Sequence, residues 1–458
     1  MYHLYFFVKS DLRRALVRRH SVATCSKLIR VGTDLSKHRF LGSSLPAAEE
    51  TPVPNTRAAI PRFGRYAGPA LFSAGFRPFF LAAALWAVVA IPLWLVAYGT
   101  GYMPPSLLLP LIWHAHEMVY GFAAAAVAGF LFTMIPNWSG RMPLQGWPLA
   151  RLVLLWLAGR VAVLSSAVIG APLAALLDLS FPLALLAVMA REIVTGRSWR
   201  NLPMLTGLFL LLIGNLLVHL QALGLTDTAQ IGNRLGIATL LMLIALVGGR
   251  IVPSFTRTWL AADKSPVALP AATTGFDHAA LAVIGVGLAV WALVPQQHLA
   301  PYCELAAGGG ALLRLLRWRG LQTRREPMLL VLHLGYGWLA AGLLLAGVDA
   351  LFDFLPQTTA LHALTVGAIG TMILGVTTRV SLRQTGRPQT AGPVTAAMYA
   401  LITVAALLRL LAPLTGDFML LVLAASGTAW CAAYGLFAIL YGRVLVQPSA
   451  GRNQAKPI

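Results

Sequence analysis

The sequence predicts an all-α, polytopic membrane protein of about twelve transmembrane helices, and three observations support this prediction. Of the 458 residues, 58% are hydrophobic and only 11% are charged, whereas soluble domains carry about 25% charged residues. Long apolar runs recur along most of the chain, and the loops between them alternate between basic and non-basic. Because so few charges cannot cover a large water-facing surface, lipid must cover much of the protein.

The apolar runs define the expected spans in order along the chain. A spanning helix needs roughly 20 mostly apolar residues, and Gly, Pro and polar clusters separate runs of about that length. The expected spans are 79–98, 114–136, 149–170, 172–194, 203–223, 233–252, 277–294, 299–317, 328–351, 359–380, 393–413 and 418–441.

Arginine and lysine in the loops predict the orientation of these spans. Every connection that follows an even-numbered span carries Arg or Lys, beginning with Arg141, whereas the connections after odd-numbered spans carry neither. Such alternation follows the positive-inside rule, so we expect both termini in the cytoplasm. The net charge of +20 is then explained by orientation of the chain in the membrane, and we expect the lipid bilayer and no nucleic acid as a partner.

Three regions of different composition follow from this pattern. Residues 1–66 contain twelve Lys or Arg and no long apolar run, which predicts a disordered, basic, cytoplasmic arm. An Arg-rich targeting segment and a start codon placed too far upstream are the alternatives. Residues 67–445 form the membrane domain, and 446–458 a short cytoplasmic tail.

A faint internal repeat suggests that the helices form three pseudo-repeated quartets. Spans 2, 6 and 10 are rich in Gly and Ala, and they end in similar runs at 135–141, 251–257 and 377–381. The alternative is that Gly-rich helices ending in Pro or Ser and Arg are common at cytoplasmic faces. Gly367 and Gly370 in span 10 either allow helices to approach closely or make room for a flat cofactor.

Several kinds of catalytic machinery are missing from the sequence. It has no Walker A loop, no dinucleotide-binding GxGxxG in a strand–helix setting, no CxxCH for covalent haem and no CxxC pair. Any redox chemistry must therefore use a cofactor within the membrane, and no catalytic residue is identified.

Histidines are the most conspicuous ionisable residues within the spans, where such residues are costly and usually functional. His114, His116, His219 and His362 are all expected within roughly 8 Å of the outer boundary, given a rise of about 1.5 Å per residue. Because neutral imidazole binds both iron and copper, four imidazoles at one depth suit a haem or copper site. The alternative for each is an ordinary hydrogen bond between helices.

The spacing of the first two histidines refines this expectation. His114 and His116 point about 200° apart on a regular helix, so they serve two sites, or one of them ligates while the other forms a hydrogen bond. Glu117 lies three residues after His114 and shares its face, so we expect it to orient that imidazole.

Other candidates lie at different depths or carry charge. His333 is expected roughly 25 Å from the outer boundary, in a second metal site, a proton path or a packed polar contact. Arg160 and Asp178 are expected to pair within the membrane. Arg234 and Arg409, near the outer ends of spans 6 and 11, either bind haem propionates or extend to the lipid headgroups.

These motifs, taken together and in order, resemble the NnrS family of bacterial membrane proteins over about residues 70–445. The matching stretches are Gly75–Phe80 (GFRPFF), Trp113–Met118 (WHAHEM), Gly248–Arg257 (GGRIVPSFTR), His333–Tyr336 (HLGY) and His362–Ala368 (HALTVGA). One departure is Gln384, where relatives are expected to carry His.

The resemblance implies a twelve-helix inner-membrane protein that binds haem and copper and acts in the response to nitric oxide, often beside denitrification. A non-covalent, b-type haem and an unidentified electron donor are expected. The resemblance makes the following residues candidate metal ligands: His114, His116, Glu117, His219, His333 and His362.

Three functions are compatible with these features. The first is a haem–copper protein that protects against nitric oxide by binding or converting it. The second is a twelve-helix secondary transporter that uses histidines as proton or metal relays, for which two related halves of six helices are expected. The third is a haem sensor or assembly factor without turnover.

Overall fold

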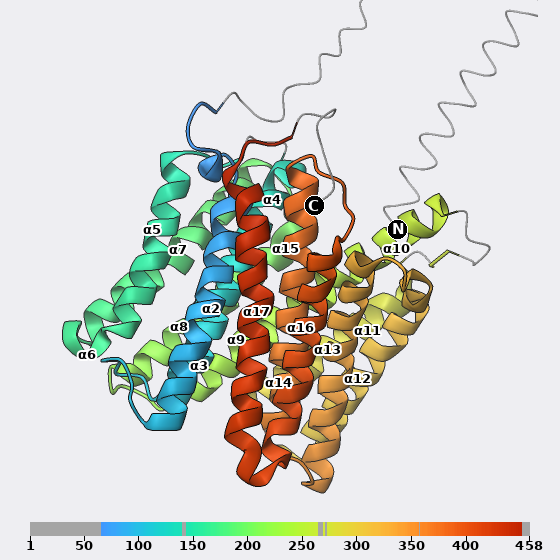
Figure 1. The fold of residues 1–458 in the computed structure, drawn as a ribbon. Helices are drawn as coiled ribbons and strands as arrows, with labels where there is room; N and C mark the ends of the chain where they lie inside the picture. Colours follow the sequence, from blue (N-terminus) through green and yellow to red (C-terminus); the bar gives the residue numbers. More distant parts are fainter. Residues whose placement is uncertain (1–65, 140–142, 264–268, 271–272, 357, 451–458) are drawn as a thin grey trace, which may run out of the picture. The chain divides into compact units, whose positions relative to one another are not determined.

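A computed structural model describes residues 66–139, 143–263, 269–270, 273–356 and 358–450 (Figure 1). These residues form helices joined by turns and irregular loops, and no strand occurs among them, as the sequence predicts. All but residue 66 of the expected basic arm, and residues 451–458 of the expected tail, lie outside the described residues. The helices are α2 (Phe76–Thr100), α3 (Pro110–His116), α4 (Ala124–Ser139), α5 (Trp147–Leu164), α6 (Ser166–Ile169), α7 (Ala171–Thr195), α8 (Leu202–Ala222), α9 (Ala229–Leu243), α10 (Gly249–Ala262), α11 (Gly275–Leu293), α12 (Ala300–Arg317), α13 (Pro327–Phe352), α14 (Thr358–His362), α15 (Thr371–Gln384), α16 (Pro393–Leu411) and α17 (Met419–Val446).

Eleven helical rods in the described part of the chain are long and apolar enough to cross a membrane. The expected eighth span corresponds to α12, which has 18 residues, as α5 does. It is not among the eleven, and it carries the charged residues Glu304, Arg314 and Arg317. The helix nevertheless packs between α11 and α13, where the expected span belongs.

Local sequence signals explain where many of these helices start. Proline occupies the first or second position of seven of them, where the missing N–H costs nothing and the fixed φ suits a helix. These residues are Pro110, Pro148, Pro172, Pro203, Pro301, Pro327 and Pro393. At the other end of α2, Gly101 adopts φ 75°, a left-handed conformation that favours glycine.

With α12 the eleven rods make twelve, and in chain order we divide them into three consecutive sets of four, which we call quartets 1, 2 and 3. Quartet 1 contains α2 to α7, quartet 2 contains α8 to α12, and quartet 3 contains α13 to α17. Contacts between α7 and α8, α12 and α13, and α17 and α2 join the quartets into a closed ring; α2 and α17 run side by side in Figure 1.

The second rod of each quartet lies in the interior of the bundle. We compare the rods by the buried share of the most apolar 18-residue stretch in each. This share is 78% in Pro110–Met134, 61% in Ala229–Ala262 and 67% in Thr358–Gln384. Seven of the other eight rods bury only 33–44% of theirs. These are the three helices that carry the repeat in the sequence, and each of them contacts another across quartet boundaries.

Each of these three inner rods also contains a π-helical segment: Glu117–Ala123, Ile244–Gly248 and Ala363–Gly370. A π segment breaks the regular pattern of backbone hydrogen bonds and often marks a functional site. In each one, a carbonyl accepts a hydrogen bond from the side chain of another helix. The pairs are Gly121 with Trp156, Ala245 with Arg314 and Gly370 with Tyr434, at 3.0, 3.0 and 2.8 Å.

The glycines of the third inner rod make room for aromatic side chains of the protein itself. A Cβ added at Gly367 would lie 2.7 Å from the indole of Trp338, and one at Gly370 would lie 2.6 Å from that of Trp430. Small residues therefore allow tight packing around this rod.

Candidate functional site

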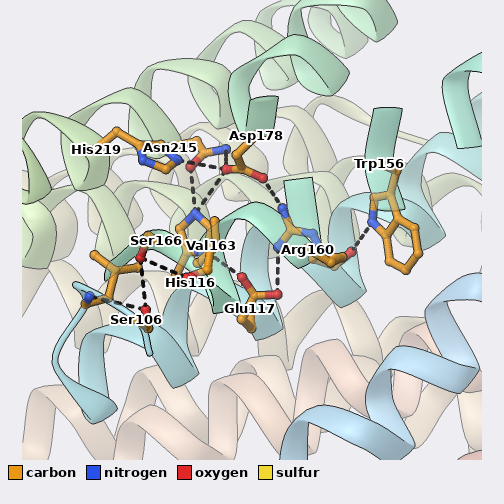
Figure 2. A network of polar contacts seen from close by, with 12 residues as sticks. Ser106, His116, Glu117, Trp156, Arg160, Val163, Ser166, Asp178, Asn215 and His219 are labelled. Atoms are coloured by element: carbon orange, nitrogen blue, oxygen red, sulfur yellow. Dashed lines mark hydrogen bonds and ion pairs between the residues drawn. The ribbon is translucent and has the colours of Figure 1, made fainter. Parts of the chain in front are cut away.

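A buried ionic cluster lies at the start of the first π segment, around His116 and Glu117 (Figure 2). His116 ends α3, and its Nδ1 lies 3.0 Å from Glu117 Oε1. Arg160, on α5, donates to Glu117 Oε2 at 2.7 Å and pairs through its other terminal nitrogen with Asp178 on α7. All four side chains are at most 2% exposed, so the guanidinium links two carboxylates in a dry interior.

Helix α8 completes this cluster with Asn215 and His219, which lie one turn apart on one face. Asn215 Nδ2 donates to Asp178 Oδ2 at 2.8 Å, and His219 Nε2 lies 2.9 Å from the same oxygen. His116 Nε2 lies 2.8 Å from Asn215 Oδ1 and 3.3 Å from Asp178 Oδ2. Four rods from two quartets thus meet at one carboxylate. The six residues His116, Glu117, Arg160, Asp178, Asn215 and His219 form what we call the quartet 1 cluster.

The hydrogen-bond donors and acceptors around His116 do not match when its ring is neutral. An ionised carboxylate only accepts hydrogen bonds, so Asp178 requires the Nδ2 side of Asn215 and turns Oδ1 of that amide toward His116. Both ring nitrogens of His116 then face oxygen acceptors, whereas a neutral imidazole has a single N–H. A second proton or a bound cation is needed to satisfy the remaining nitrogen.

Aromatic side chains hold this cluster in place. Tyr120 donates to the carbonyl of Gly232 at 2.6 Å, and its ring centroid lies 5.2 Å from that of His116. The indole N–H of Trp156 donates to Gly121 in the π segment. The π segment is thereby fixed to its neighbours at both of these points.

Two sequence-based expectations about this region have clear outcomes. The expected pairing of Arg160 with Asp178 is confirmed. The expected orientation of His114 by Glu117 is wrong, because Glu117 contacts His116 instead. That expectation assumed a regular helix, whereas the π segment begins at Glu117 and Arg160 holds its carboxylate.

His114 and His362 line a different site, a cavity of about 1360 Å³. We call it the central cavity. It lies between helices of all three quartets, and the side chains around it combine cations with aromatic rings. Its lining includes His114, His362, Arg234, Arg409, Trp94 and Trp430.

Neither cavity histidine is hydrogen-bonded to another side chain of the described residues. Nδ1 of His362 donates to the backbone carbonyl of Thr358 at 2.6 Å, which leaves Nε2 as the nitrogen with a lone pair. His114 stacks on Trp94 with ring centroids 4.3 Å apart. Its Nδ1 is buried and has no hydrogen-bond partner among the described residues.

The two arginines expected near the outer ends of spans 6 and 11 line the same cavity. Arg409 is close enough to both His114 and His362 for their charges to interact. Arg234 interacts electrostatically with Glu304 of α12, another cavity residue.

His333 belongs to neither site. Its Nδ1 donates to the carbonyl of Leu329 at 2.9 Å, and its Nε2 lies 3.2 Å from Thr256 Oγ1. The structure therefore separates the six candidate ligands into His114 and His362 at the cavity, His116, Glu117 and His219 in the quartet 1 cluster, and His333 elsewhere.

Sequence reasoning missed some residues of both sites. Asn215 carries a weak signal, because it precedes His219 by four residues and so shares its face of a helix. Trp94 carries none, since an aromatic residue in an apolar span is unremarkable. Glu304 is conspicuous as a carboxylate inside an expected span, but its role as a cavity residue depends on tertiary packing.

Comparison with known proteins agrees with these features. The pattern of one protein family, described as NnrS protein, matches residues 70–449, which include both sites and all of the helices α2 to α17. No curated protein matches the chain. Because the family pattern covers well over half of the sequence, the chain belongs to the NnrS family.

Proposed function

We propose that this protein is a haem-binding protein of the bacterial inner membrane that acts in the response to nitric oxide. The observation that carries the proposal is the central cavity, where His114 and His362 approach one space from two separate helices. Membership of the NnrS family supports the link to nitric oxide.

The residues of the cavity fit a haem. Its volume of about 1360 Å³ exceeds the roughly 300–1,000 Å³ typical of small-molecule sites. His362 is the first residue that would hold the iron, because metal-bound histidines normally donate their other N–H to a carbonyl or carboxylate, as His362 does to Thr358. His114 is the second imidazole at the same cavity.

The arginines and aromatic rings of the cavity suit the propionates and the flat ring of a haem. Arg234 and Arg409 would bind the propionates, for which a guanidinium is well shaped, and Trp94 and Trp430 would provide aromatic walls, since all four line the cavity. Without a CxxCH motif in the sequence, the haem is held non-covalently, as a b-type group. Haem iron supplies a site that binds nitric oxide and exchanges one electron.

The three-part architecture favours this proposal over a secondary transporter. Transporters of comparable size are commonly built from two related halves. The described helices instead form three quartets, each with a π segment in its second rod.

Replacing His362 tests the haem site. His362→Ala should remove or shift the haem absorption of the purified, full-length protein. His278→Ala is the matched control, because His278 also donates through Nδ1 to the carbonyl four residues earlier but lies outside the cavity. If both His362→Ala and His114→Ala retain full haem with unchanged spectra, the proposal fails. Nitric oxide added anaerobically together with a chemical reductant then separates binding from turnover, since binding removes only a stoichiometric amount of the gas whereas turnover consumes it continuously.

The loop charges lead us to infer that both termini are cytoplasmic and that the loop before α3 is on the outer side. Pro105→Cys and Leu321→Cys, each in a cysteine-free background, test this orientation, because both positions are exposed. An impermeant thiol reagent added to whole cells with a permeabilised outer membrane should label residue 105 only. Labelling of residue 321 alone would reverse the orientation.

A further inference from the structure

We propose that His116, Asp178 and His219 form a transition-metal site, distinct from the central cavity. They are the one group of described His, Cys, Asp and Glu residues that offers three ligand atoms close together, all within 4.8 Å of one another. All three side chains are buried. This inference does not depend on haem binding at the cavity.

The distances already approach those of a coordination sphere. Ligand atoms about 2.0–2.1 Å from a tetrahedral metal lie about 3.3 Å from each other. Asp178 Oδ2 lies 3.3 Å from His116 Nε2 and 2.9 Å from His219 Nε2. The amide oxygen of Asn215, 2.8 Å from His116 Nε2, is a fourth donor beside these three.

The surrounding side chains match the outer environment of a metal site. Histidines that bind metals commonly donate their second N–H to a carboxylate, which fixes the ring and its tautomer. Glu117 takes this position at Nδ1 of His116, which leaves Nε2 directed at Asp178. Arg160 in turn holds both Glu117 and Asp178 in place.

Charge favours a cation at this point. Two carboxylates and one guanidinium leave the quartet 1 cluster with one more negative than positive charge when both imidazoles are neutral. A buried, uncompensated charge is costly. A second proton on His116 or a metal cation between its Nε2 and Asp178 would offset that charge and satisfy the nitrogen that otherwise faces two oxygens, and the metal titration below distinguishes the two.

The ligands indicate the class of metal. Two imidazoles and one carboxylate suit borderline first-row ions such as Cu²⁺, Zn²⁺ and Fe²⁺. Soft Cu⁺ favours thiolate and thioether ligands, and no cysteine or methionine belongs to the quartet 1 cluster. Elemental analysis distinguishes copper, zinc and non-haem iron, and copper(II) also gives an electron paramagnetic resonance signal with hyperfine splitting from its nitrogen ligands.

His219→Gln is the sharpest test, because the amide can keep the hydrogen bond to Asp178 while the imidazole ligand is lost. The full-length protein is purified, stripped with a chelator and titrated with Cu²⁺ and with Zn²⁺, and the bound metal is counted. We expect one saturable site per chain in the wild type and its loss in His219→Gln, with any haem absorption unchanged. His333→Gln is the matched control, since His333 is also buried and hydrogen-bonded but lies elsewhere.

Two further variants separate a metal site from a structural ion cluster. Asp178→Asn should abolish metal binding, and Glu117→Gln should weaken it about 10–100-fold, as expected for a residue that only orients a ligand. Monodisperse elution and unchanged helicity establish that each variant is folded. The inference is overturned if the wild type shows no saturable site for either metal, or if folded His219→Gln binds metal as tightly as the wild type.

Discussion

Two histidines of this protein each stand immediately before a π segment, yet their surroundings differ. His116 precedes Glu117–Ala123 and His362 precedes Ala363–Gly370. His116 is fully buried and faces oxygen atoms at both ring nitrogens. His362 is held by one backbone carbonyl and lines a large cavity.

The difference teaches how one backbone feature serves two kinds of site. The π segment after His116 is surrounded by charges from α5 and α7, so its histidine is fixed within an ion cluster. The segment after His362 packs against the rings of Trp338 and Trp430, and its histidine bonds only a backbone carbonyl and lines the central cavity. The first arrangement suits a small ion, and the second suits a large, flat group.

Replacing the arginine of each site should give the largest contrast. Arg160→Leu leaves the buried carboxylates of Glu117 and Asp178 without their guanidinium, which should cost about 3–5 kcal/mol of unfolding free energy. Arg409→Leu should cost less than about 1 kcal/mol, because no hydrogen bond joins Arg409 to another described side chain, and should instead weaken haem retention. Unfolding in mixed micelles measures both free energies.

Arg160→Lys provides the control for charge alone. It keeps the positive charge but cannot bridge two carboxylates in the same way, so its stability should fall between those of the wild type and Arg160→Leu. A wild-type stability for Arg160→Leu would show that the ion cluster contributes nothing to the fold, and the contrast between the two sites would disappear.

The sequence predicts the helical framework well because that framework follows from local chemistry. Apolar runs of membrane length and the proline residues at helix starts are visible in one dimension, and eleven of the expected spans are found as helices of membrane length. The remaining expected span, the eighth, corresponds to α12, and the charged residues of α12 explain why it is not among these eleven helices. The repeat at spans 2, 6 and 10 also corresponds to a structural pattern, since these are the three rods with π segments.

The partners within each site were harder to predict, because they depend on tertiary packing. The pairing of Arg160 with Asp178 was accessible, since two opposite charges in adjacent spans have few alternatives. The π segment at Glu117 was not, and it redirects that carboxylate from His114 to His116. Which histidines share a site likewise depends on how the inner rods face each other, and a single sequence does not encode that in any local pattern.

An effect smaller than that of Arg160→Leu is expected from the side chains that donate hydrogen bonds to the π segments. Tyr434→Phe removes the O–H that donates to Gly370 beside the cavity, and Trp156→Phe removes the N–H that donates to Gly121 beside the ion cluster. A buried carbonyl that loses its donor costs about 1–3 kcal/mol, so Tyr434→Phe should lose about that amount in mixed-micelle unfolding. Trp156→Phe should lose somewhat more, because it also leaves unfilled space against Trp86, with which its ring packs edge-on.

Tyr102→Phe is the control, since Tyr102 is 71% exposed and its substitution should change stability by no more than about 0.5 kcal/mol. If Tyr434→Phe is as stable as Tyr102→Phe, the third π segment does not need its cap. The resemblance between the two π segments would then be one of backbone shape only.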